Sequence, residues 1–158
     1  MSKIKVFLQA VLDQALAEFE KKNNTVSLYT LAFYHDHESK AVSICIDTEE
    51  NSKMKLVQEN KYNMEYFQEA LEEKDLAAIA SWNANIERNS SIGDFAFINL
   101  AYTPLAALKG GKQLYLSMIQ VVLDNEERIA MLTNEKYKLA FFCSGPNYEV
   151  EYKWKCIN

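Results

Sequence analysis

The sequence predicts an α+β fold in a single domain spanning residues 1–158, with an antiparallel sheet built from two hairpins and helices packed on it. Two observations predict this fold. Apolar residues recur every three or four positions near the N-terminus and in the last third of the chain, which is typical of amphipathic helices. Elsewhere, paired runs of β-branched and aromatic residues are joined by short polar segments, which is typical of hairpins. Together they favour one α+β domain.

The first predicted helix lies near the N-terminus. Eight apolar residues recur there at spacings of three and four, which places them on one face of a helix. Lys21 and Lys22 indicate where this helix ends, because cations stabilise the negative end of the helix dipole. The apolar face consists of Ile4, Phe7, Leu8, Val11, Leu12, Ala15, Leu16 and Phe19.

Two hairpins are predicted, one after this helix and one at the C-terminal end. Residues 26–34 and 41–46 are rich in β-branched and aromatic side chains, and the polar segment 35–40 joins them. Such a pattern favours an antiparallel pair. The second pair, 138–143 and 148–157, flanks a Ser-Gly-Pro-Asn turn. Apolar and charged residues alternate in its last strand, which predicts one buried and one solvated face.

Helices are predicted between the hairpins. Asp47 or Thr48 is suited to cap a helix within Glu49–Asn60, because a side-chain oxygen there accepts a hydrogen bond from an unpaired amide. A second helix is predicted over Asn63–Glu73. The apolar run Leu76–Trp82 fits both a helix and a buried strand, since periodicity does not separate the two.

Two further segments complete the predicted order of elements. Residues 83–94 are polar and contain Ser90, Ser91 and Gly93, which is typical of a loop. Residues 112–123 form a largely apolar pattern that predicts a buried helix, which could continue as far as Met131.

The net charge of −5 comes from one segment of the chain. Residues 47–75 hold nine acidic and four basic residues, whereas the rest of the chain holds 13 of each. An acidic protein lacks the basic surface that nucleic-acid phosphates require, which argues against a nucleic-acid partner. In the predicted helix Asn63–Glu73, Met64, Phe67 and Leu71 share one face, and acids line the opposite one. This acidic stripe consists of Glu65, Glu69, Glu72 and Glu73.

Two interpretations of the acidic stripe stay open. It is either a solvated helix face or a steering surface for a basic protein, because a field of one sign speeds association and selects an orientation. Like charges four residues apart on a helix cost about 0.2–0.5 kcal/mol per pair. Only Lys61 and Lys74 are placed to relieve this repulsion.

No residue pattern specifies a reaction. The two histidines, His35 and His37, are predicted to lie in a hairpin turn. On a strand, residues at i and i+2 share a face and could share a metal, but no third histidine completes a site, so the turn is favoured. The sequence contains neither a glycine-rich phosphate loop nor a serine-nucleophile motif. We therefore expect no cofactor and no metal, and we assign no catalytic residue.

The cysteines and the apolar runs predict a compartment. Cys45, Cys143 and Cys156 are odd in number and far apart, which indicates neither a disulfide framework nor a zinc site. The N-terminal apolar pattern is interrupted by polar residues and shows no cleavage site of a signal peptide. No stretch reaches the roughly 18 apolar residues of a membrane span. We expect a cytoplasmic protein that does not contact a membrane.

The chain resembles a bacterial family in several short segments. Leu28–Asp36, the short strand after it and the helix start at Asp47–Glu50 resemble the domain-of-unknown-function 4303 family. Ser81–Asn83 and the terminal Cys156–Asn158 are similar to that family's tryptophan-containing middle and closing strand. The resemblance implies the order of elements given above, while segment 85–111 matches no pattern of the family.

Small acidic α+β proteins of this kind are similar to immunity proteins, which protect bacteria from polymorphic or contact-dependent toxins. Many of these toxins are basic nucleases, whose phosphate-binding sites an acidic face would suit. The resemblance therefore implies a non-enzymatic protein-binding domain that neutralises a toxin through the acidic stripe. Two alternatives stay open: a small hydrolase or metal-dependent enzyme, and a structural subunit of a larger assembly. The sequence does not predict the oligomeric state.

Overall fold

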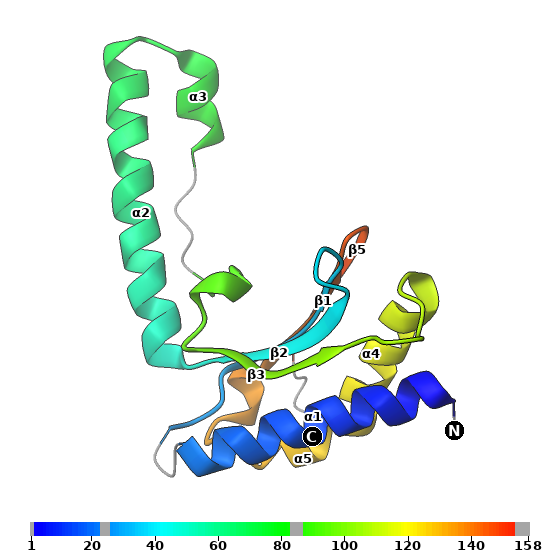
Figure 1. Ribbon diagram of the computed structural model, residues 1–158. Coiled ribbons are helices and arrows are strands. Elements are labelled where there is room, and N and C mark those ends of the chain that lie inside the picture. Colours follow the sequence, from blue (N-terminus) through cyan, green and yellow to red (C-terminus); the bar gives the residue numbers. More distant parts are fainter. Residues whose placement is uncertain (1, 23–25, 83–86, 154–158) are drawn as a thin grey trace.

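A five-stranded mixed sheet organises the fold, with α1, α4 and α5 against one face and α2 projecting away from the other (Figure 1). The computed structural model describes residues 2–22, 26–82 and 87–153. The helices are α1 (Lys3–Lys22), α2 (Glu49–Glu72), α3 (Leu76–Ser81), α4 (Lys112–Asp124) and α5 (Glu126–Ala130). The strands are β1 (Thr30–Asp36), β2 (Ala41–Asp47), β3 (Phe97–Pro104), β4 (Ala140–Gly145) and β5 (Tyr148–Lys153). The α+β fold is thus confirmed.

The strand order is β3-β2-β1-β4-β5, and both predicted hairpins are present as the antiparallel pairs β1–β2 and β4–β5. The prediction of a wholly antiparallel sheet is wrong at its centre, where β1 and β4 run parallel with Thr30 opposite Ala140. Parallel neighbours need a long crossover, and the helices between the two hairpins supply it. Strand β3, which the sequence did not predict, pairs antiparallel with the other edge of β2.

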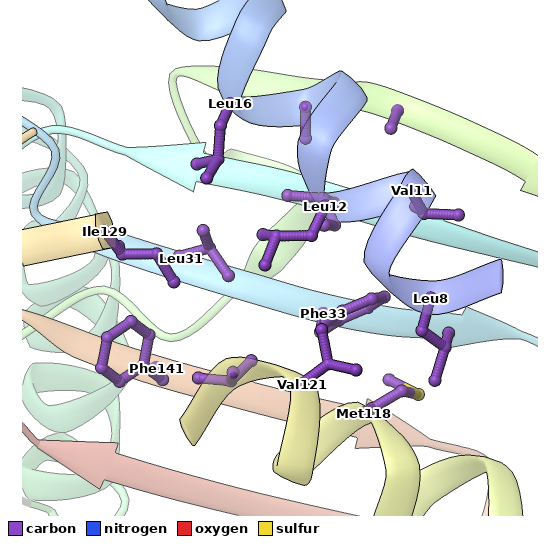
Figure 2. Packing of buried hydrophobic residues seen from close by; sticks show 14 of the residues in the cluster. Leu8, Val11, Leu12, Leu16, Leu31, Phe33, Met118, Val121, Ile129 and Phe141 are labelled. Carbon is purple, nitrogen blue, oxygen red and sulfur yellow. The ribbon is translucent and has the colours of Figure 1, made fainter. Parts of the chain in front are cut away.

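The main hydrophobic core lies between the sheet and helices α1, α4 and α5 (Figure 2). Leu8, Leu12 and Leu16 project into it from one face of α1, as the apolar spacing predicts. They meet Phe33 of β1 and Met118 of α4, which are fully buried. Burying each such side chain contributes roughly 1.5–3 kcal/mol, so the core fixes these helices to the sheet.

One continuous helix replaces the two helices predicted between residues 49 and 73. Thr48 caps it, since the amide of Asn51 donates to Thr48 Oγ1 at 3.2 Å. Helix α2 then runs unbroken from Glu49 to Glu72, because this stretch contains neither Gly nor Pro to interrupt it. The run that fitted both a helix and a strand forms helix α3, which Asp75 caps by accepting from the Ala78 amide at 3.1 Å.

The C-terminal third largely follows the prediction. The helix predicted from residue 112 ends at Asp124, and α5 follows as a separate short helix. Residues 154–157 of the predicted last strand, which include Cys156, lie outside the described residues, and so does Asn83. Within residues 2–22, 26–82 and 87–153, no helix is both long enough and apolar enough to cross a bilayer.

Candidate functional site

The arm formed by α2 and α3 (residues 49–81) is the part of the molecule that stands furthest from the core. In Figure 1, α2 rises away from the sheet and α3 folds back beside its far half. These two helices pack on each other more than on any other element. Only Ser52, Leu56 and Ala70 are buried in α2, and no residue of α3 is buried. Most of the arm's surface is therefore open to a partner.

The acidic stripe lies on the outward half of the arm. Glu65, Glu69, Glu72 and Glu73 are all exposed, and they follow one another along one side of α2 as the helical period requires. Within the described part of the chain, none of these four carboxylates forms an ion pair. The field of these four charges is thus not neutralised locally.

Two tyrosines lie beside the acidic stripe, and sequence reasoning missed them. The rings of Tyr62 and Tyr66 meet edge to face with centroids 4.9 Å apart, and their hydroxyl oxygens are 2.6 Å apart in a hydrogen bond. Both side chains are more than half exposed, at 58% and 55%. The hydrogen bond with Tyr62 and the charges of Glu69 and Glu65 raise the pKa of Tyr66. Their i, i+4 spacing was the available signal.

The face of α2 that the sequence predicts to be apolar is largely uncovered. Phe67 packs against Trp82, with ring centroids 5.0 Å apart, but Met64 and Leu71 are 39% and 49% exposed. Met64 and Leu71 therefore stay exposed, although they share a face of α2 with Phe67. With Val57, which is also exposed, Met64 and Leu71 form an apolar stripe spaced at seven residues.

A buried polar cluster fixes the start of α2, where the arm joins the sheet. Asp47 is fully buried, and its Oδ1 accepts from Asn51 Nδ2 at 2.7 Å and from the Ala96 amide at 3.1 Å. Burial raises the pKa of Asp47, although these hydrogen bonds oppose the shift. The backbone amide of the buried Asn89 donates to Ser52 Oγ at 2.9 Å. The cluster ties the first turn of α2 to the chain that returns from α3.

Arg88 fixes this returning chain to the sheet. Its guanidinium stacks on the Tyr29 ring, 3.6 Å from the ring centroid. It donates to the carbonyl of Tyr29 at 2.7 Å, to Thr30 Oγ1 at 2.5 Å and to the carbonyl of Lys138. Arg88 thereby joins the start of β1 to the residues before β4, and the polar loop predicted at 83–94 gave no sign of this role.

The structure separates the two histidines. His35 is the last but one residue of β1 and is buried, whereas His37 lies beyond the strand and is exposed. The prediction that His35 lies in the turn is wrong, because β1 continues to Asp36. Burial, and then the nearby His37, lowers the pKa of His35. Among the described residues, no group of three or more His, Cys, Asp or Glu side chains is placed to hold a metal ion.

Two cysteines of the described residues are buried free thiols. Cys45 and Cys143 are 2% and 3% exposed. Burial raises the pKa of Cys45, and it raises the pKa of Cys143 to about 12. Because the thiolate is the reactive form, both thiols are suited to packing rather than to nucleophilic chemistry.

Comparison with known proteins found no matching family model, no matching curated protein and no matching solved structure. The resemblance to the domain-of-unknown-function 4303 family therefore stays a prediction. The candidate site rests on the arm itself, a helical projection that offers charge and exposed aromatic rings.

Proposed function

We propose that this chain is a non-enzymatic protein-binding domain of the immunity-protein kind, which neutralises a basic toxin domain by docking it on the arm. The observation that carries the proposal is the acidic stripe, which forms no ion pair with any described residue and lies beside the exposed pair Tyr62 and Tyr66. Carboxylates steer a basic partner, and tyrosines are among the residues that most often anchor protein interfaces. A projecting helical hairpin also reaches into a concave surface, such as a phosphate-binding cleft.

The cytoplasm is the compartment that this proposal requires, because an immunity protein acts where the toxin would do damage. The free thiols of Cys45 and Cys143 support it, since unpaired cysteines are usual in a reducing compartment. Nucleic acid and membranes are not among the proposed partners.

The acidic stripe is tested by charge reversal against the protein encoded by the reading frame next to this gene. The variant carries Glu65→Lys, Glu69→Lys, Glu72→Lys and Glu73→Lys. We expect the association rate constant, measured by stopped flow at low salt, to fall by at least about tenfold. The difference should shrink at high salt, because screening removes long-range steering.

The matched control reverses four exposed acids outside the arm, namely Glu20, Glu38, Asp94 and Glu127. It changes the net charge by the same amount and should slow association much less. Equal slowing in both variants would show that only net charge matters. An unchanged association rate in the stripe variant would remove the stripe from the interface.

The tyrosine pair is tested by its effect on dissociation. Tyr62→Ala and Tyr66→Ala remove exposed rings without changing charge, so we expect the dissociation rate to rise while the association rate stays near that of the wild type. A change confined to the association rate would contradict an anchoring role. Far-ultraviolet circular dichroism would check that α2 keeps its helicity.

The apolar stripe Val57–Met64–Leu71 supports a second candidate function, that of a subunit in a larger assembly. A seven-residue apolar repeat on an exposed helix is the pattern by which helices pair. Sedimentation equilibrium of the wild type distinguishes the two functions. A monomer favours the toxin-binding proposal, whereas an oligomer that Met64→Lys dissociates favours the assembly.

A further inference from the structure

A small cavity lies between the end of β1 and the N-terminal half of α4, on the sheet face that carries the main core. Its volume is about 140 Å³. Leu114 and Met118 of α4 are fully buried and form its apolar floor, while Gly111, Pro146 and Asn147 are exposed at its rim. An engineered apolar cavity of roughly 150 Å³ binds benzene, so this volume suits a small organic molecule.

His35 supplies the polar wall of the cavity. It is only 8% exposed, and its imidazole has no hydrogen bond to any residue in the described part of the chain. Alternate residues of a strand share a face, so His35 projects towards α4 on the same side as Leu31 and Phe33. Its ring nitrogens are not fully shielded from solvent, and His35 lines the cavity, so a ligand in the cavity can reach them.

Two glycines border His35, and at one of them, Gly110, an added side chain would collide with the ring. A Cβ at Gly110 would lie 2.7 Å from His35 Cε1, and one at Gly145 would lie 3.7 Å from His35 Cβ. The ring therefore occupies space that a side chain at residue 110 would take. Three separate parts of the chain, β1, the start of α4 and the β4–β5 turn, converge on this cavity.

The start of α4 supplies further donors at the rim. Gly111 is the N-cap residue, with a φ of 97°, and no side chain caps this 13-residue helix. The first backbone amides of a helix lack intrahelical partners, and the helix dipole is positive there. A carboxylate at the rim would thus meet the positive end of the helix and, deeper in the cavity, the imidazole.

We propose that this cavity binds a small monocarboxylate, whose apolar body rests on Leu114 and Met118 and whose carboxylate accepts hydrogen bonds from His35 and the start of α4. The apolar floor selects a branched or aromatic body, and the donors select the anion. This site is independent of the arm and of the function proposed for it.

The test titrates the full chain with isovalerate and benzoate, with isovaleramide as the neutral comparison, and follows amide shifts of residues around the cavity by NMR. We expect saturable binding of at least one acid at millimolar concentrations. Isovaleramide and the His35→Phe variant should bind about tenfold more weakly or worse, because each lacks one side of a charge-assisted hydrogen bond. Equal binding of acid and amide, or no saturable binding of either acid, would overturn the proposal.

Two further variants keep the test decisive even if His35→Phe does not fold. Gly145→Val fills the cavity from a position where an added Cβ meets only ordinary contact distances, so it should abolish binding. Leu116→Phe enlarges an exposed side chain of α4 outside the cavity and should leave binding unchanged. Undiminished binding in Gly145→Val would place the acids elsewhere on the protein and contradict the proposal.

Discussion

Near the end of β1, the position of the His35 side chain depends on Gly110 having no side chain of its own. The imidazole of His35 lies where a Cβ at Gly110 would come within 2.7 Å of it. We expect Gly110→Ala to destabilise the protein by about 1–3 kcal/mol, the usual cost of overpacking. Urea unfolding monitored by circular dichroism measures this difference in the free energy of unfolding.

Gly93→Ala is the matched control, because nothing lies within 4 Å of its added Cβ. Its free energy of unfolding should stay within about 0.5 kcal/mol of the wild type. Combining Gly110→Ala with His35→Ala removes the clash, so the double variant should lose less stability than the two single variants together. Strict additivity would show that the imidazole is not what Gly110 accommodates.

Asp47 predicts a pH dependence of stability with an unusual sign for a carboxylate. Burial raises the pKa of Asp47 in the native state above the ordinary aspartate value of 3.8, so the native state holds this proton more tightly than the unfolded state does. Between the two pKa values, its contribution to stability therefore falls as the pH rises. We expect Asp47→Asn to gain stability relative to the wild type as the pH rises from about 4 to 7.

Asp124→Asn is the control with the opposite sign. The ion pair with Lys5 lowers the native pKa of Asp124, so this carboxylate adds stability that is lost as the pH falls. The Asp124→Asn variant should thus lose stability relative to the wild type as the pH rises. Thermal melts across the pH range compare the two, and parallel trends would contradict the burial argument for Asp47.

At the scale of elements, the two halves of α2 differ in how firmly the rest of the protein fixes them. The first turns of α2 are fixed by the Thr48 cap and by the buried polar cluster around Asp47. In the part of α2 beyond residue 60, only Ala70 is buried. Few buried contacts make local opening easy. We expect amides of α2 beyond residue 60 to exchange with solvent faster than those in the middle of α1. Protection in the far half of α2 equal to that of α1 would contradict this picture.

The sequence predicts elements better than it predicts their surroundings. The period of Leu8, Leu12 and Leu16 gives both the helix and its buried face, because α1 lies flat on the core. The same reasoning places Met64 and Leu71 on one face of α2 but does not predict their exposure, since spacing shows which residues share a face and not whether another element covers that face. Long-range placement decides the second question.

Of the two candidate sites, the acidic stripe can be predicted from the sequence and the surroundings of His35 cannot. Periodicity gathers the four carboxylates of the acidic stripe on one face, and their charge predicts that this face is exposed, because unpaired carboxylates are rarely buried. The environment of His35 depends on Gly110 and Gly145, which are distant in sequence and meet it only in the folded sheet. Local patterns carry no signal for such a convergence.

At the scale of the whole molecule, the core and the arm are separable. The main core draws residues from α1, the sheet, α4 and α5, and none from α2 or α3. Strand β4 lies between β1 and β5, so it is an internal strand, and it contributes Phe141 and Cys143 to the core. Stability should therefore depend on the C-terminal hairpin and not on the far half of the arm.

Two deletions test this separation together. Replacing residues 68–81 by a linker of about four glycines and serines is feasible, because Phe67 and Trp82 already pack with ring centroids 5.0 Å apart. We expect this variant to keep a cooperative thermal unfolding transition and to lose binding to a basic partner, since Glu69, Glu72 and Glu73 are removed. A chain that stops at Asn134 lacks β4 and should not fold, because β1 and the apolar faces of α1 and α4 lose their cover. Unfolding of the linker variant would show that the arm belongs to the cooperative unit. Folding of the truncated chain would show that stability does not depend on the C-terminal hairpin. Retained binding in a folded linker variant would move the partner's contact away from the acidic stripe.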